Sequence, residues 1–152
     1  MLDTGLHIRP FTIHDQAAAR TLILNGLGEH FGFIDETFTP DLNDITASYL
    51  APSHLFLVAE WQQTLVGTGA LLIQSAATGQ IVRVSTHHAY RRLGIARALC
   101  QQLLDHARQR GLHRLIVETG RDWHVAISLY QHLGFQQYTR ESGSRYFAMD
   151  LS

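Results

Sequence analysis

The sequence predicts an α/β fold, in which one domain spanning residues 1–152 carries a mixed β-sheet with helices on its faces. A first observation is that 152 residues, 45% of them hydrophobic and 16% charged, suit one ordinary globular domain. A second is the order of the expected elements, β-α-α-β-β-β-α-β-α-β-β, which follows from hydrophobic periodicity. A run of strands followed by alternating helices and strands favours a mixed sheet over a purely parallel one.

The first part of the chain is expected to form a strand, two helices and three further strands. These elements cover residues 6–11, 14–27, 41–50, 55–60, 65–74 and 80–86, in this order. The first helix has an apolar face of alanine, leucine and isoleucine, and Gly26, Gly28 and Gly32 favour a loop after it. The second helix is predicted to begin after Pro40, because proline is tolerated in the first turn of a helix. The three strands that follow are apolar runs, and a tight turn joins the first two of them.

The second part of the chain is expected to alternate helices with strands. The helices cover residues 94–110 and 123–133, and the strands cover residues 114–119, 135–138 and 145–149. The first of these helices is amphipathic, because Ile95, Leu99 and Leu103 share one face, and Gly111 ends it. Gly134 ends the second helix in the same way. The remaining segments are short apolar runs that are typical of strands.

Charge and composition argue against several classes of function. Twelve Lys and Arg residues face 13 Asp and Glu residues, and the net charge of −1 argues against electrostatic binding to nucleic acid or to an anionic membrane. The longest nearly apolar stretch, residues 65–73, is too short to span a bilayer, and no signal peptide is visible. The single cysteine, Cys100, excludes an intramolecular disulfide and fits a reducing compartment. We therefore expect a cytoplasmic protein.

The ten histidines raise the question of a metal site. They are scattered along the chain, with no H-E-x-x-H motif and no closely spaced set of Cys and His, so no metal is expected. His87 and His88 adjoin on an extended segment, which predicts that their rings point to opposite sides and chelate poorly. Cys100 lies near the apolar face of its helix and is expected to pack in the core rather than act as a nucleophile.

The most informative segment, residues 82–99, is a strand that runs through a loop into the long helix. A helix start offers N–H groups without partners and the positive end of the helix dipole, and Gly94 lets an anion approach the backbone. Arg91, Arg92 and Arg97 add positive charge in a form that suits phosphate. The segment has neither the Gly-Lys-Ser/Thr of nucleoside-triphosphate loops nor the G-x-G-x-x-G of dinucleotide folds. Its residues alone leave two interpretations, a pyrophosphate cradle or an ordinary helix start with solvated arginines.

Two motifs carry a resemblance to a known family. Arg91-x-x-Gly94-x-Ala96 resembles the Arg/Gln-x-x-Gly-x-Gly/Ala signature of the GCN5-related N-acetyltransferases, the GNAT superfamily. Residues 126–135, AISLYQHLGF, resemble the closing A-x-x-L-Y-x-x-x-G-F of that family. The order of elements is also similar over nearly the whole chain. The resemblance implies a GNAT-like fold, a central mixed sheet with splayed parallel strands and about four flanking helices, with acetyl-CoA as the cosubstrate.

The resemblance also implies which residues bind the cosubstrate. The splayed strands correspond to residues 80–86 and 114–119, and the pantetheine arm pairs with the backbone of the first, while the pyrophosphate rests on N–H groups of the loop and helix start. The cofactor-binding residues implied in this way are Val84, Ser85, Thr86, Arg91, Arg92, Leu93, Gly94, Ile95, Ala96 and Arg97. A kink in the first strand near Val84 or Ser85 is expected to expose a backbone N–H for the oxyanion.

Tyr130 matches the tyrosine that faces the thioester sulfur in this family. The resemblance implies that it is a general acid that protonates the leaving CoA thiolate. The alternative is a tyrosine that only packs in the core. The chain departs from the family at Trp123, where many members carry an asparagine that hydrogen-bonds the pantetheine. Trp123 is expected to pack the helix start against the sheet and is not assigned to the site.

The acceptor is expected to bind near the glycine-rich loop after the first helix, which lines the acceptor pocket in this family. Glu29 is assigned there as a substrate contact, because a carboxylate beside aromatic side chains suits a cationic amine. The candidates for the base that deprotonates the amine are Glu29, Glu60, Glu118, His87 and His88. A solvated surface residue remains the alternative for each of them.

The expected function is transfer of an acetyl group from acetyl-CoA to a primary amine of a small molecule. The amine attacks the thioester directly in a ternary complex, so no acyl-enzyme is needed. Two alternatives remain: acetylation of a protein N-terminus or lysine side chain, and non-catalytic binding of acyl-CoA. Dimers are common in the family, so a homodimer is also left open.

Overall fold

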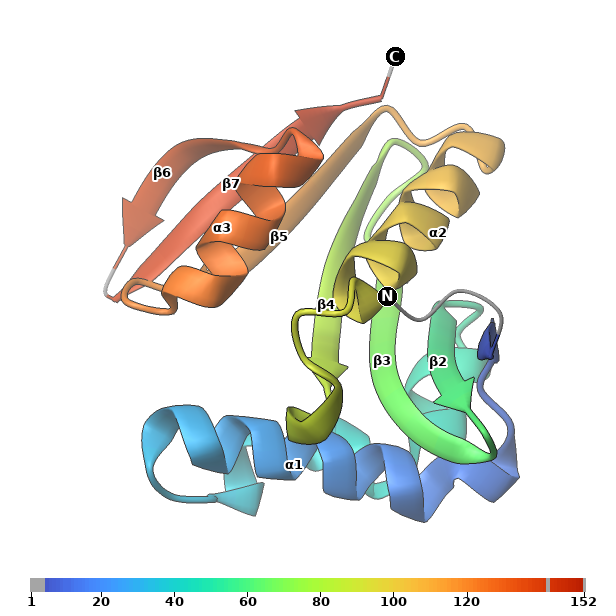
Figure 1. Ribbon diagram of the computed structural model, residues 1–152. Coiled ribbons are helices and arrows are strands. Elements are labelled where there is room, and N and C mark those ends of the chain that lie inside the picture. Colours follow the sequence, from blue (N-terminus) through green and yellow to red (C-terminus); the bar gives the residue numbers. More distant parts are fainter. Residues whose placement is uncertain (1–4, 142, 152) are drawn as a thin grey trace.

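Seven strands form a mixed sheet with helices on both of its faces (Figure 1). The structure is a computed structural model that describes residues 5–141 and 143–151. The strands are β1 (Leu6–Pro10), β2 (Leu55–Trp61), β3 (Thr64–Ile73), β4 (Thr78–Thr86), β5 (Arg114–Gly120), β6 (Gln136–Glu141) and β7 (Ser144–Asp150). The α-helices are α1 (Gln16–Phe31), α2 (Ile95–Gln109) and α3 (His124–Leu133). The predicted α/β class and the mixed sheet are confirmed.

The order of strands across the sheet is β1-β2-β3-β4-β5-β7-β6. Among the described residues β4 and β5 form the one parallel pair, and all other neighbours run antiparallel. The parallel pairing extends only from Thr78 opposite Arg114 to Ile81 opposite Val117. Beyond that point β4 continues to Thr86 and β5 to Gly120 without pairing to each other. The splay that the family resemblance implied is therefore present in this chain.

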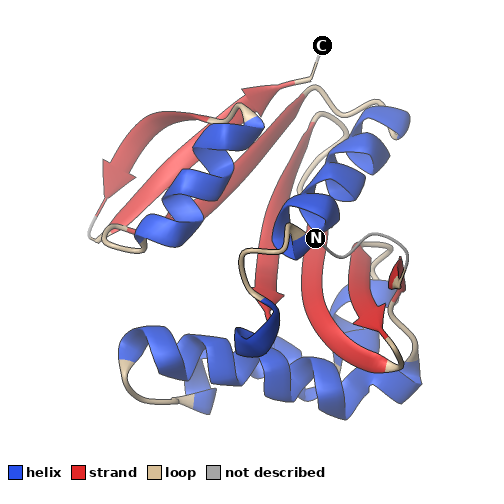
Figure 2. Ribbon diagram, in the orientation of Figure 1, coloured by secondary structure: helices blue, strands red, loops and turns tan. Residues whose placement is uncertain are grey.

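The hydrophobic core is divided by the sheet into two clusters. The helices α2 and α3 lie over the sheet (Figure 2), and they share one cluster with Leu71, Ile81 and Phe147. The other cluster joins α1 to Phe56 and Val58. Side chains of one strand contribute to both clusters because successive residues point to opposite faces. No helix in the described part of the chain is both long and apolar enough to cross a lipid bilayer.

The first helix continues beyond its predicted end at residue 27 and stops at Phe31. Gly26 and Gly28 lie inside α1 instead of starting a loop, and this part of the prediction is wrong. A Cβ at Gly26 would come within 2.9 Å of the Ser85 Oγ, so the glycine allows α1 to pack closely against β4. Gly32 ends the helix with a φ of 82°, a left-handed conformation that favours glycine.

The predicted helix over residues 41–50 is divided into two short turns. A 3-10 turn covers Pro40–Asn43 and a π turn covers Thr46–Leu50. Asp44 interrupts the helical path between them, and its carboxylate accepts a hydrogen bond of 3.0 Å from the Ala47 N–H. Aspartate in such a cap competes with the backbone for helical hydrogen bonds, so the helix restarts rather than continues. The other predicted elements agree with the structure, with ends that differ by a few residues.

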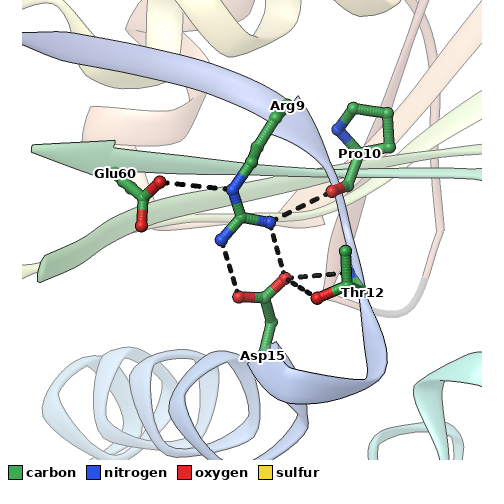
Figure 3. Close-up of polar contacts among 5 residues, drawn as sticks. All are labelled: Arg9, Pro10, Thr12, Asp15 and Glu60. Carbon is green, nitrogen blue, oxygen red and sulfur yellow. Dashed lines mark hydrogen bonds and ion pairs between the residues drawn. The ribbon is translucent and has the colours of Figure 1, made fainter. Parts of the chain in front are cut away.

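An ion-pair network connects the first strand to the start of α1 (Figure 3). The Arg9 guanidinium donates to both Asp15 carboxylate oxygens, at 2.7 and 2.8 Å, and its Nε donates to Glu60 at 3.3 Å. Asp15 also accepts a hydrogen bond of 2.8 Å from the Thr12 N–H. The hydrogen bonds from Arg9 are the main reason that the pKa of Asp15 lies below its ordinary value, although burial opposes the shift.

We expect Asp15→Asn to lower the free energy of unfolding by about 2–3 kcal/mol at neutral pH, because a mostly buried, charge-assisted pair is lost. The lowered pKa means that this stabilisation is present above the unfolded-state pKa of about 3.9 and is lost as pH falls through the folded-state value. Urea unfolding at neutral and acidic pH measures both effects. Asp105→Asn is the control, because its ion pair with Arg108 is exposed and 3.8 Å long. Equal losses in the two variants would contradict the prediction.

Candidate functional site

The edge of β4 that faces β5 is free of strand partners after Ile81. Val84, Ser85 and Thr86 lie in this part of β4, and all three are partly buried. On its other edge β4 remains paired with β3, with Ser85 opposite Thr68. An unpaired strand edge inside a sheet can bind an extended chain by backbone hydrogen bonds. The structure thus brings together three predicted cofactor residues on one free edge.

A β-bulge bends β4 at the start of this free edge. Thr68 pairs with Ser85 and Ala70 with Val82, so two residues of β4 stand opposite one residue of β3. The first of the two, Arg83, has a φ of 55°, and the side chain of Thr68 donates a hydrogen bond of 2.8 Å to its carbonyl. The kink expected near Val84 or Ser85 is therefore present, and it begins one residue earlier. Arg83 itself was not predicted as a site residue.

The loop after β4 leads into α2 through two left-handed residues. Arg92 has a φ of 64° and Gly94, the residue that precedes the helix, has a φ of 87°. The first hydrogen bond that closes a helical turn runs from the Ala98 N–H to the Gly94 carbonyl, at 3.0 Å. The N–H groups of residues 95–97 precede that bond and point out of the helix end. This geometry matches an anion cradle made of backbone donors.

The side chains around the cradle have different exposures. Arg91, Arg92 and Arg97 are exposed and Leu93 is partly buried. Ile95 is only 1% exposed and belongs to the core, so it can contribute to an anion site through its backbone alone. The predicted positive charge is therefore local to the loop and the first turn of α2.

Glu29 lies in the last turn of α1 and not in a loop. Its carboxylate forms an ion pair with Arg91, with oxygen–nitrogen distances of 2.5 and 3.1 Å. Hydrogen bonding from Arg91 is the main cause that lowers the pKa of Glu29. The residue predicted to contact the acceptor is thus joined to one predicted to contact the pyrophosphate. Both side chains are exposed, and exposed ion pairs contribute little to stability.

The C-terminal half of α1 crosses the wide end of the gap between β4 and β5. Gly26 lies against Ser85 of β4, and the His30 Nε2 would be 4.0 Å from a Cβ placed on Gly120 at the end of β5. Trp123, the residue before α3, stacks on the His30 ring with centroids 3.9 Å apart and planes inclined by 9°. Trp123 therefore packs against α1, and its Cβ would also lie 3.8 Å from a Cβ placed on Gly120 at the end of β5.

Tyr130 lies on α3 and is 7% exposed, with its ring packed edge-on against Phe135. Burial is the main cause that raises the pKa of its phenol, so the group stays protonated at neutral pH. In the described part of the chain its hydroxyl has no hydrogen-bond partner. No described side-chain oxygen or nitrogen is both fully buried and without a partner, so this hydroxyl still reaches accessible space. It is a protonated donor that no described group of the protein engages.

The carboxylates considered as bases have other contacts. Glu60 accepts the Arg9 Nε at 3.3 Å, on the β2 side of the sheet that lies away from β5. Glu118 on β5 is exposed and accepts a hydrogen bond of 2.9 Å from the Ser144 hydroxyl. Neither is brought next to Tyr130 by a contact in the structure. The choice of base therefore stays a prediction.

The histidines and the cysteine are the residues that raised the question of a metal site. His87 and His88 stack with ring centroids 4.6 Å apart, which corrects the expectation that they point to opposite sides. The reason is that a 3-10 turn begins at His88, so the segment is not extended. Among the described residues no group of three His, Cys, Asp or Glu side chains could hold a metal ion. Cys100 is buried, and burial raises the pKa of its thiol to about 12, as expected for a core residue.

Comparisons with known proteins agree with this geometry. The model of the acetyltransferase (GNAT) family matches residues 23–135. Human N-acetyltransferase 8 is 33% identical over 123 residues, which cover 77% of this chain and 52% of that protein. The chain spans about half the length of the human and rat relatives that it matches.

Solved structures share the fold. A GNAT-family acetyltransferase from Staphylococcus aureus Mu50 superposes with a TM-score of 0.88 at 20% identity, over 97% of this chain and 100% of that chain. The PaiA N-acetyltransferase from Thermoplasma acidophilum, in complex with coenzyme A, superposes with a TM-score of 0.83 at 19% identity, over 97% and 99%. The overall fold of this chain is thus a known one.

Proposed function

We propose, from the premise that the chain belongs to the acetyltransferase (GNAT) family, that it transfers an acetyl group from acetyl-CoA to a primary amine of a small molecule. The observation that carries this proposal is the combination of a free β4 edge after Ile81 with the uncapped start of α2 beside it. The first suits an extended amide-bearing arm and the second suits a pyrophosphate. Pantetheine and pyrophosphate are joined in this way in coenzyme A, which is bound in the Thermoplasma neighbour.

The cosubstrate would bind along the chain segment that the sequence motif marks. The pantetheine amides pair with the backbone of Val84, Ser85 and Thr86, and the pyrophosphate receives N–H groups from the first turn of α2. Arg91, Arg92 and Arg97 neutralise its charge from the surrounding loop and helix surface. The Arg91 side chain then has an anion to bind in place of Glu29, and the Glu29 carboxylate becomes available to an ammonium group.

The chemistry needs one bond to form and one to break. The neutral amine attacks the thioester carbon, and the oxyanion of the tetrahedral intermediate accepts a hydrogen bond from a β4 backbone N–H near Val84 or Ser85. The carbon–sulfur bond then breaks, and the Tyr130 hydroxyl donates its proton to the leaving thiolate. The amine proton leaves to a base or to water, and solvent returns a proton to Tyr130. Positioning of the two substrates supplies the rest of the rate.

The acceptor would enter beside the C-terminal end of α1. Glu29 supplies negative charge there. Phe31 and Phe33 flank Gly32 in the sequence, and their side chains are 53% and 61% exposed. A carboxylate close to accessible aromatic rings suits a small amine that carries a positive charge before reaction. The buried Cys100 fits the reducing interior of a cell, and a cytoplasmic location is part of the proposal.

The test combines ligand binding with turnover. Acetyl-CoA and CoA at about 100 times their dissociation constant are expected to stabilise the fold by about 2.7 kcal/mol, measured as a rise in melting temperature. Release of free CoA thiol from acetyl-CoA is then followed with panels of small amines, polyamines, amino acids and peptides. Turnover with small amines supports the proposal, and turnover with peptides alone replaces its acceptor by a protein. Binding without turnover indicates a non-catalytic domain, and absence of any thermal shift overturns the cosubstrate assignment.

A further inference from the structure

The bulge of β4 is formed by a residue that is unusual for its place. Arg83 has a left-handed φ of 55° although it carries a side chain, and a non-glycine residue in this region is strained. It is also a charged residue in a central strand, between Val82 and Val84. Strained residues persist only where their surroundings hold them in place. The contacts of Arg83 therefore need an explanation.

The side chain of Arg83 is held by a carboxylate from a distant segment. Its Nε and Nη2 donate to the two Asp41 oxygens at 3.0 and 2.7 Å, a bidentate arrangement, and the two side chains are 22% and 27% exposed. The Tyr49 hydroxyl donates to the same carboxylate at 2.6 Å. Burial would raise the pKa of Asp41, but the hydrogen bonds from Arg83 and Tyr49 hold it below its ordinary value. Asp41 therefore accepts both donors as an anion.

The backbone of Arg83 is held by a second contact, from the neighbouring strand. The fully buried Thr68 on β3 donates its hydroxyl to the Arg83 carbonyl at 2.8 Å. Tyr49 is itself fixed, since it is 4% exposed and its ring packs edge-on against Phe56 at 5.0 Å. Side chain and carbonyl of the same strained residue are thus clamped by two separate parts of the fold. Such a clamp fixes the direction of the backbone that follows it.

We propose that Asp41 is a positioning residue for acetyl transfer, which acts through Arg83 to keep the β4 bulge in its left-handed form. The backbone that follows the bulge at Val84 and Ser85 then presents its N–H group to the developing oxyanion in the direction that the reaction needs. This inference rests on the proposed function. Asp41 would touch neither substrate in this role. It lies in the 3-10 turn Pro40–Asn43, which stands where the second helix was predicted.

The role predicts a specific pattern among variants. Glycine adopts a positive φ without strain, so a glycine at position 83 no longer needs an anchor. We expect Asp41→Asn to lower kcat about 10- to 100-fold, the range of a small misplacement of catalytic groups, with KM for acetyl-CoA changed by less than about threefold. Arg83→Gly is expected to lower kcat less than Asp41→Asn does, and the double variant to match Arg83→Gly rather than Asp41→Asn.

Asp44→Asn is the matched control, because it changes the same residue type three positions away and its contact is with the Ala47 N–H of its own segment. Asparagine caps as well as aspartate, so kcat should not change. If Asp41→Asn does not fold, Tyr49→Phe removes one hydrogen bond to Asp41 and keeps the ring, and we expect kcat to fall by about twofold to fivefold.

Steady-state kinetics and CoA-induced thermal shifts on each folded variant test the proposal. A lower melting temperature with an unchanged kcat in Asp41→Asn would make the clamp purely structural and overturn the proposal. Equal inactivity of Arg83→Gly and the double variant would mean that Arg83 acts itself, which also overturns it. A wild-type protein without turnover, whether or not CoA binds, would instead count against the proposed function.

Discussion

Replacement of Tyr130 by phenylalanine is expected to lower kcat for acetyl transfer by about two to four orders of magnitude, the usual contribution of a general acid. The variant keeps the ring that packs against Phe135 and removes only the hydroxyl. Because that hydroxyl has no hydrogen-bond partner among the described residues, its loss leaves no protein group unsatisfied. We therefore expect the melting temperature and the affinity for acetyl-CoA to stay close to those of the wild type.

The pH dependence gives a second readout of the same residue. Burial raises the pKa of Tyr130 above its usual value of about 10, so the phenol stays protonated through the range in which amines lose their proton. The rate should rise with pH as more amine becomes neutral, with no fall caused by ionisation of Tyr130 in that range. In Tyr130→Phe the same rise is expected at a lower level, because the base and the amine are unchanged.

Tyr138→Phe is the control for this substitution. Tyr138 lies on β6 and is 48% exposed, so removal of its hydroxyl should change neither kcat nor stability. Thiol release by the two variants is compared at saturating acetyl-CoA and amine. Wild-type kcat in Tyr130→Phe would contradict the assignment as general acid and would return Tyr130 to the role of a core residue.

The order of elements and the mixed sheet could be predicted because they depend on local patterns. Alternating or continuous apolar runs mark the strands, and glycines such as Gly111 and Gly134 end helices with the left-handed conformation that the prediction assumes. The end of α1 could not be predicted in this way. Gly26 reads locally as a helix breaker, but its lack of a side chain serves a contact with Ser85, nearly 60 residues away in the sequence.

In the candidate site, too, features within one sequence motif could be predicted and contacts between distant residues could not. The candidate cradle at the start of α2 lies within one motif, so Gly94 and the arginines near it could be proposed from spacing and family resemblance. The contact of Asp41 with Arg83 joins residues 42 positions apart, and that of Glu29 with Arg91 joins residues 62 apart. Neither pair has a sequence motif. One available signal was an arginine between two valines at the centre of a strand, which indicates a charge that needs a partner.

The second large effect is expected at the cradle, where we predict that Arg91→Glu combined with Gly94→Glu raises the dissociation constant of acetyl-CoA at least about 100-fold. The double change places negative charge beside the pyrophosphate and removes a guanidinium that would bind it. It also puts a side chain on a residue with a φ of 87°, which strains the backbone. A Cβ at Gly94 meets nothing within 4 Å, so the cost of the change to the fold is limited to this backbone strain.

A matched control lies at the other end of the same helix. Arg110→Glu with Gly111→Glu makes the same change in charge, and Gly111 has a comparable φ of 79° with nothing within 4 Å of its Cβ position. Any loss of affinity caused by net charge or backbone strain alone would therefore appear in both double variants.

Calorimetric titration with CoA separates the cases once circular dichroism has shown that both are folded. Weak binding only in the Arg91 and Gly94 variant assigns the pyrophosphate to the start of α2, because the two ends of one helix differ in the sign of their dipole and in which backbone groups are free. Unchanged affinity in that variant would remove the cradle from the site, and the free edge of β4 would then have to bind the cosubstrate without it.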